Sequence, residues 1–252
     1  MRAAGRELPT ARQARGEIVV SERCAITRLP QRIFGADLWL VDLSVTAASS
    51  DCLSPAEQAR AARFVFAVDR RRYVAAHVAL RSLLGEFCGL AAADVRLILG
   101  PNDKPSVAGR PDCTFNMSHS GERALIAITR PVQPGDEIGV DLEELRGLTD
   151  IDALAAANFT AAEQAELAVA AAGDRERLFL SGWTRKEACL KAIGSGLTIA
   201  PSTFDCALAP GRTDVRMSTP AGAAVIAVES IEIGPGHLAA IAITTPVSQD
   251  RA

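Results

Sequence analysis

An internal repeat constrains this 252-residue sequence more than any other feature. Four short strings occur twice in the same order, which predicts two copies of one structural unit. Each copy would span roughly 100 residues, and the two would meet near residues 130–137. The paired strings are VDLS (41–44) and VDLE (140–143), PAEQAR (55–60) and AAEQAE (161–166), GL (89–90) and GL (196–197), and IAIT (126–129) and IAIT (241–244).

Both copies have the same expected order of elements. A short strand precedes a helix-start signal at Ser54-Pro55 or at Thr160, and a long amphipathic helix and closing strands follow. This order indicates an α+β fold of two pseudo-symmetric halves, each a small, mainly antiparallel sheet packed on a long helix. The predicted strands are 37–43, 94–99, 123–129, 137–143, 203–208, 223–233 and 237–244; the second helix is 175–193, and 131–135 and 210–222 are linker and loop.

The domain boundaries follow from the repeat. We expect an N-terminal half over residues 35–133, a C-terminal half over 134–246 and a short tail over 247–252. Residues 1–34 contain seven arginines and lack an apolar signal core, which favours a poorly ordered leader. An organelle-targeting peptide is the alternative. The apolar runs of the chain fall short of the ~20 residues that span a membrane, so no membrane partner is expected.

Charge and cysteine content narrow the class of protein. A net charge of −3 argues against a nucleic-acid binder, so an anionic ligand must be held by a local cluster of cations. Six cysteines without a C-x-x-C pair are typical of reduced, packed thiols, which predicts a cytoplasmic protein. Only Lys104, Lys186 and Lys191 are lysines among 27 basic residues. A compact ammonium is required at these positions, or they are lysine by chance.

The two copies differ in charge at matched positions. When the strands are aligned on the VDL strings and the helices on the two GL pairs, the second half carries charged residues where the first does not. The scaffold is therefore duplicated, whereas the charged site is predicted only in the second half. The pairs are Ser44 and Glu143, Ala79 and Lys186, Leu80 and Glu187, and Leu84 and Lys191.

The strand predicted at 137–143 carries two acids on one face. Strand alternation places Asp141 and Glu143 together, opposite Ile138, Val140 and Leu142. Hard carboxylate oxygens suit Mg²⁺, and two adjacent carboxylates repel each other unless a cation is present. The alternative is an exposed strand face that carries two acids.

The second long helix adds a charged stripe. Trp183, Glu187 and Lys191 are spaced at four-residue intervals and so share one face, with Lys186 beside them. An ordinary solvated pair of Glu187 and Lys191 is the alternative. The apolar counterparts in the first half favour a stripe that faces protein or a cleft.

The string FNMSHSG (115–121) gathers hydroxyl, imidazole and backbone N–H groups. It lacks the glycine spacing of a nucleophile elbow, and a tight turn here would make a cradle for phosphate. The arginines at 60, 63 and 70–72 form either a charged surface face or, with Lys104 and His119, a receptor for a multiply charged anion. His77 is interpreted as a packed histidine.

These strings together resemble the Sfp-type branch of the phosphopantetheinyl transferase superfamily. The resemblance covers about residues 37–244, and four ordered motifs at family spacing make it specific. The four motifs are NDKPSV (102–107), FNMSHSG (115–121), IGVDLEE (138–144) and WTRKEACLKAIGSGL (183–197). The segment SPAEQARAARFVFAVDRRRYVAAHVALRSLLG (54–85) also resembles the family's N-terminal helical region.

The resemblance implies a role for each matched residue. Asp141, Glu143 and Glu187 would hold Mg²⁺, with Mn²⁺ as a substitute, together with the coenzyme A pyrophosphate. Lys191 would be the catalytic lysine beside the departing 3′,5′-ADP. The general base would be Glu187 or a metal-bound water beside Glu143. Glu57 departs from relatives that carry a base there. The residues that would bind the phosphates of coenzyme A are Arg63, Arg72, Lys104, Ser118, His119 and Lys186.

The implied activity is transfer of 4′-phosphopantetheine from coenzyme A to a serine of an apo acyl or peptidyl carrier protein. The site would lie in the cleft between the halves of a monomer. Two alternatives stay open: a Mg²⁺-dependent phosphohydrolase that uses the same acids, and a catalytically silent carrier-protein binder.

Overall fold

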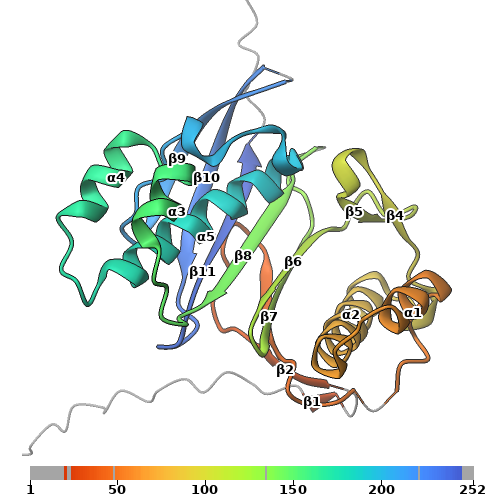
Figure 1. Cartoon of the computed structure of the whole chain (residues 1–252). Helices are drawn as coiled ribbons and strands as arrows, with labels where there is room; N and C mark the ends of the chain where they lie inside the picture. The colour runs from red at the N-terminus through yellow and green to blue at the C-terminus, as the bar shows by residue number, and fades with distance from the viewer. Residues whose placement is uncertain (1–19, 22–23, 48, 134, 221, 246–252) are drawn as a thin grey trace, which may run out of the picture.

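The computed structural model describes residues 20–21, 24–47, 49–133, 135–220 and 222–245. The expected tail at 247–252 and the leader up to residue 19 lie outside the described residues. Within the described part, no helix has the length and apolar character needed to cross a bilayer. The predicted α+β class with two halves is confirmed (Figure 1).

The N-terminal half is a five-stranded antiparallel sheet with a long helix on one face. The order is β1 (Val20–Ser21), β2 (Cys24–Arg28), β3 (Asp37–Asp42), β7 (Arg123–Thr129) and β6 (Thr114–Ser120), and the helix is α2 (Ala67–Cys88). β2 falls in the segment expected to be a poorly ordered leader, so that boundary is wrong. Ile26 of β2 is buried in the core beneath α2, which explains why the segment is ordered.

The C-terminal half repeats this plan with four antiparallel strands. The order is β8 (Ile138–Glu144), β11 (His237–Thr245), β10 (Gly222–Ile231) and β9 (Arg212–Thr219), and helices α3 (Ile151–Asn158), α4 (Ala161–Ala168) and α5 (Arg175–Ile193) follow β8. Helix α5 covers the predicted residues 175–193. A short helix α1 (Pro55–Ala62) and a hairpin of β4 (Leu97–Leu99) and β5 (Pro105–Val107) complete the first half.

Two strand assignments in the C-terminal half were wrong. Residues 212–219, expected to be a loop, form β9, in which Val215 and Met217 alternate with polar residues and are buried. Residues 203–208 show a similar alternation but form no strand. The carbonyl oxygens of Phe204 and Cys206 accept hydrogen bonds from the side chains of Lys186 and Arg185, so side chains of α5 replace a sheet partner there.

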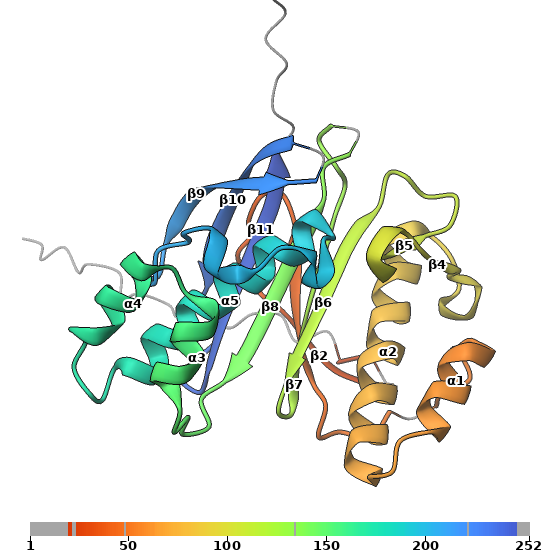
Figure 2. The ribbon, with the colours of Figure 1, turned by 45° about the horizontal axis from the view of Figure 1, so that its top comes forward.

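The described residues form four apolar cores, of which one packs α3 and α4 against the start of α5. The other three involve the sheets. One lies between α2 and the first sheet, and a second lies between α5 and the second sheet. The third joins the two sheets and contains Leu38 and Leu125 from the first and Val140 and Ile241 from the second. The two long helices therefore lie on opposite flanks of the joined sheets (Figure 2).

The helices of the two halves correspond closely, but not in the register that the sequence predicted. Helices α1 and α4 both begin with a capping box, at Ser54 and at Thr160. Helices α2 and α5 both end at a left-handed glycine, Gly89 and Gly194. The predicted alignment of Gly89 with Gly196 is therefore wrong by two residues. In the corrected register Arg81 matches Lys186, Ser82 matches Glu187, and Glu86 matches Lys191.

The repeated strand strings also differ in orientation. Val41 packs in the core under α2, whereas Val140 packs in the core between the sheets. A shift of one residue turns a side chain to the other face of a strand. Asp42 and Asp141 thus lie on opposite faces, and Asp141 takes the place that apolar Val41 has in the first half.

Candidate active site

The candidate site lies where the two sheets meet. β6 and β8 are edge strands of different sheets, and they run side by side at the centre of the molecule (Figures 1 and 2). Three alternate side chains of β6 form hydrogen bonds to β8, and we call this row, Asn116, Ser118 and Ser120, the β6–β8 seam. Asn116 Oδ1 accepts from Val140 N at 3.0 Å, Ser118 Oγ donates to Asp141 Oδ1 at 2.8 Å, and Ser120 Oγ donates to Glu143 Oε2 at 2.9 Å.

The prediction of a tight turn at residues 115–121 is wrong. These residues form most of β6, in which Phe115 and Met117 pack toward α2. The alternation of apolar and polar residues in FNMSHSG was the signal for a strand with two different faces. Asn116 and Ser120 are thus site residues that sequence reasoning did not single out.

Close packing of α5 on β8 fixes the direction of the acids. A Cβ atom on Gly139 would lie 2.2 Å from the carbonyl oxygen of Ala188, so only glycine allows this approach. Ile138, Val140 and Leu142 face the core between the sheets, as predicted. Asp141 and Glu143 therefore point to the α5 side.

Lys191 comes from α5 to meet Asp141. Its Nζ lies 2.6 Å from Asp141 Oδ1 and 3.0 Å from Ser118 Oγ. Asp141 is 5% exposed, and its Oδ2 is buried without a hydrogen-bond partner. Burial raises the pKa of Asp141, although Lys191 and Ser118 oppose the rise. The carboxylate is therefore held in its place with one oxygen free to take a cation.

Glu187 lies one turn before Lys191 on the same side of α5. Burial and the neighbouring carboxylates of Asp141 and Glu143 raise the pKa of Glu187, and Lys191 opposes them. Glu143 accepts a hydrogen bond from Ser120 and pairs with Arg146 at 3.2 Å. The three predicted acids thus share one local field of negative charge.

The chemistry of these acids fits Mg²⁺. Among the described residues, no three His, Cys, Asp or Glu side chains surround a common point as a formed metal centre would. Asp141 Oδ2 nevertheless lacks a partner, and like charge disfavours ionisation of Glu187, so a hard cation would relieve both.

His119 and Arg72 of the N-terminal half lie next to the three acids. Burial, then the charges of Lys191 and Arg72, lower the pKa of His119. Arg72 pairs with Glu122 at 2.7 Å and with Asp69 at 3.6 Å. Glu122, which the sequence did not draw attention to, thereby holds Arg72 at the turn between β6 and β7.

Lys104 borders a hollow of about 280 Å³ beside Glu187 and Lys191. Its Nζ contacts Ala192 O at 3.0 Å, Ile138 O at 3.2 Å and Glu137 Oε2 at 2.8 Å. Burial lowers the pKa of Lys104, and Glu137 opposes the shift. In this arrangement Lys104 ties the end of α5 to the start of β8.

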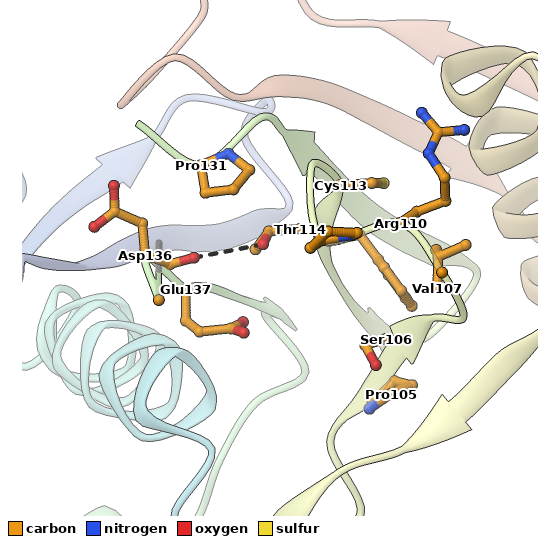
Figure 3. A pocket seen from close by; sticks show the side chains of 13 residues that line it. Pro105, Ser106, Val107, Arg110, Cys113, Thr114, Pro131, Asp136 and Glu137 are labelled. Carbon is orange, nitrogen blue, oxygen red and sulfur yellow. Dashed lines mark hydrogen bonds between the residues drawn. The ribbon is translucent and has the colours of Figure 1, made fainter. Parts of the chain in front are cut away.

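A second hollow, of about 370 Å³, adjoins the contact of Lys104 with Glu137. Figure 3 shows Asp136 and Glu137 on one side of it and Val107 and Arg110 on the other. Thr114 Oγ1 donates to Asp136 O at 3.4 Å and so links the start of β6 to the connection between the halves.

Two predicted phosphate contacts lie apart from this group. Arg63 is exposed at the end of α1, where it borders a surface hollow with Arg60 and Phe64. Lys186 is fully buried and pairs with Glu163 at 2.8 Å. A phosphate cannot reach its ammonium in this structure, so we remove Lys186 from the expected ligand set.

Comparison with known proteins finds the same family in both halves. A model of the 4′-phosphopantetheinyl transferase superfamily matches residues 137–242, and a model of a 4′-phosphopantetheinyl transferase N-terminal region matches residues 39–130. These ranges contain Asp141, Glu143, Glu187 and the three lysines.

Three relatives agree with these matches. The chain is 37% identical over 161 residues to the 4′-phosphopantetheinyl transferase HetI of Nostoc sp., covering 63% of this chain and 64% of HetI, slightly less than two thirds. It is 29% identical over 195 residues to psf-1 of Bacillus pumilus, covering 77% of this chain and 80% of psf-1. It is 26% identical over 195 residues to Sfp of Bacillus subtilis, covering 77% of this chain and 83% of Sfp. With one match in each half of a duplicated fold, the chain belongs to the 4′-phosphopantetheinyl transferase superfamily.

Proposed function

We propose that this protein transfers the 4′-phosphopantetheine group of coenzyme A to a serine of an apo acyl or peptidyl carrier protein. Adenosine 3′,5′-bisphosphate is the second product. The observation that carries the proposal is the contact of Lys191 with Asp141 and Ser118, beside Glu187, at the junction of two halves that both match transferase families. This cluster offers both signs of charge at one place, as pyrophosphate chemistry requires.

In the reaction, the serine oxygen forms a bond to the β-phosphorus of coenzyme A. The bond from that phosphorus to the bridging oxygen breaks, and the bisphosphate leaves with the electron pair. The serine proton passes to a base. Such a transfer depends mainly on positioning and on neutralising the negative charge that accumulates.

Asp141, Glu143 and Glu187 would hold a Mg²⁺ ion, or Mn²⁺, which supplies positive charge to the pyrophosphate oxygens. Lys191 provides the protein's own positive charge at this place. Its hydrogen bonds to Asp141 and Ser118 orient the ammonium toward β8, where it can stabilise the departing phosphate oxygens.

Glu187 is the proposed base for the serine proton. Its carboxylate lies one turn of α5 before Lys191, beside the acids of β8, where the attacking serine would have to approach the pyrophosphate. Arg72, Ser118 and His119 would hold phosphates of coenzyme A, since they border the charged cluster. Arg63 and Lys104 remain further proposed contacts, and Lys104 would first have to exchange a protein acceptor for phosphate.

Carrier proteins are the proposed partners. Since β6, β8 and α5 belong to one chain, a monomer supplies every proposed catalytic residue. We therefore propose that the monomer is active.

Intact-mass analysis of several apo carrier proteins tests the function. Each carrier is incubated with this protein, coenzyme A and Mg²⁺, and at least one should gain the mass of one phosphopantetheine. A carrier with its serine replaced by alanine is the negative control, and Asp141→Ala of this protein should lose most of the turnover.

The two alternatives predict different results in the same assay. Rapid cleavage of coenzyme A without a carrier would favour a phosphohydrolase. Tight binding of an apo carrier without any mass gain would favour a silent binder. Either result would overturn the proposed transfer.

A further inference from the structure

The interior of each half contains the same buried ion pair. In the first half, Glu57 at the third position of α1 pairs with Arg81 of α2, Oε2 to Nε, at 2.7 Å. In the second half, Glu163 at the third position of α4 pairs with Lys186 of α5, Oε2 to Nζ, at 2.8 Å. Both glutamates also complete the capping box of their short helix.

The cation of each pair then binds the segment that follows its long helix. Arg81 donates to the carbonyl oxygens of Ala92 and Val95, at 3.2 and 2.8 Å. Lys186 donates to those of Pro201, at 2.8 Å, and Phe204. In both halves the acceptors are the first residue of a single 3₁₀ turn and the residue directly after that turn. We call each set a clamp: the first is Glu57 with Arg81, and the second is Glu163 with Lys186.

The second clamp is the drier of the two. Lys186 and Glu163 both have no exposed side-chain surface, whereas Glu57 is 12% exposed. The other oxygen of Glu163 accepts from Cys206 N at 2.9 Å. Removal of one partner from such a pair leaves a buried charge without compensation, so each partner depends strongly on the other.

The second clamp also borders the candidate site. Lys186 directly precedes Glu187 in α5. The chain it grips at Pro201 and Phe204 continues from Gly194 and Gly196, which line the hollow beside Lys191. The clamp therefore fixes the helical turn that carries the proposed base and the far end of the segment whose start lines the hollow.

We propose that Lys186 is a positioning residue that acts through Glu163, and that the second clamp holds Glu187 and the 194–206 segment in place for the reaction. The inference rests on the proposed function, because it assigns Lys186 to the support of the transfer site rather than to phosphate binding. The first clamp has the same construction without the catalytic neighbours, so it is a control within the same chain.

A double-mutant cycle separates the two roles. Lys186→Met leaves Glu163 buried without its cation, and kcat for carrier modification should fall about 30-fold, with a smaller change in the KM for coenzyme A. Adding Glu163→Gln removes the stranded charge, and kcat should return to within about fivefold of wild type. A double variant that folds but is as inactive as Lys186→Met would overturn the proposal, since direct action of Lys186 on substrate predicts that result.

Further variants distinguish a loss of positioning from a general loss of stability. Lys186→Arg reproduces the cation of the first clamp and should remain folded and active within about tenfold of wild type. In the first half, Arg81→Met should lower the thermal midpoint of unfolding, with Glu57→Gln restoring it, while kcat stays within about twofold of wild type. Loss of kcat in the Arg81 variants equal to that in Lys186→Met would show a general stability effect and contradict the assignment.

The unfolding measurements need no substrate. If no carrier is modified by the wild type, the proposed function fails. The recovery of the thermal midpoint in the double variant Lys186→Met/Glu163→Gln then still tests the pairing. An unfolding midpoint that Lys186→Met leaves unchanged would overturn the clamp itself.

Discussion

The two halves of the molecule share their framework and differ along one strand face and one helix stripe. Strand β3 presents apolar Trp39 and Val41 to α2, where Val41 is buried in the core and Trp39 lines a hollow of about 310 Å³ between the sheet and the helix. Strand β8 presents Asp141 and Glu143 to α5 at the corresponding place. The same framework therefore presents an apolar strand face to the long helix in one half and an acidic strand face in the other.

The helices differ in the same way. Ser82 donates to Val78 O of its own helix at 2.9 Å, and it lines the hollow beside Trp39 together with Glu86. Their counterparts, Glu187 and Lys191, face the acids of β8. The caps and the clamps occur in both halves, so they account for the shared fold. The chemistry must then come from the positions that differ, which are the acids of β8 and the residues Glu187 and Lys191 of α5.

Removal of Lys191 should have the largest effect. Lys191→Met deletes the ammonium beside Asp141, and we expect kcat to fall by about 10³ because the departing phosphate loses its positive partner. The matched change in the other half, Glu86→Gln, should leave kcat within about twofold. The measurement is carrier modification followed by intact mass. Equal losses in the two variants would remove the functional distinction between the halves.

Glu187→Gln should lower kcat by about 10², because the proposed base is lost. Ser82→Ala in the first half is the control and should leave kcat unchanged. Circular dichroism should show that Glu187→Gln remains folded. Wild-type turnover by this variant would exclude Glu187 as the base.

The same variant should be more stable than wild type in the absence of ligands. The folded-state pKa of Glu187 is raised above its usual value of 4.5, so folding loses stability as pH rises through that pKa. Glutamine does not ionise and avoids this loss. The thermal midpoint should be higher by about 2 °C at pH 8, and the gap should close below about pH 4.5. A lower midpoint at pH 8 would contradict the sign of the shift.

His119→Ala should mainly affect binding of coenzyme A. We expect about a tenfold higher KM with kcat within about threefold, because a charged imidazole anchors phosphate. The lowered pKa of His119 means that it carries its charge only below the usual value of 6.5 in the free protein. The wild-type KM should therefore rise with pH, and the variant should lack this rise. An effect confined to kcat would contradict phosphate anchoring.

Ser120→Ala should have the smallest effect. It removes a hydrogen bond to Glu143 Oε2 and one from Glu144 N, which cost about 1 kcal/mol together in the free energy of unfolding by urea. Ser82→Ala removes only a bond within a helix and should cost less. If both cost the same, the seam would contribute nothing particular to the junction.

Much of this could be predicted from local sequence. The alternation in residues 138–144 predicted which face of β8 carries the acids, and the apolar period of 175–193 predicted α5. The register between the halves could not be predicted, because VDL occurs in both copies but faces different cores. The burial of Lys186 was also hidden, since it depends on Glu163 in another helix and on carbonyl groups of a loop that looks like a strand.

Strands β6 and β8 are joined by hydrogen bonds of hydroxyl and amide groups, and two of the acceptors are the carboxylates of Asp141 and Glu143 that are proposed to hold the cation. A proton or a cation that engages Asp141 Oδ1 or Glu143 Oε2 competes with the serines of β6 for those oxygen atoms. Occupancy of the cleft and cohesion of the two halves are consequently linked equilibria. A substrate that fills this cleft also changes how firmly the two parts of the chain are joined.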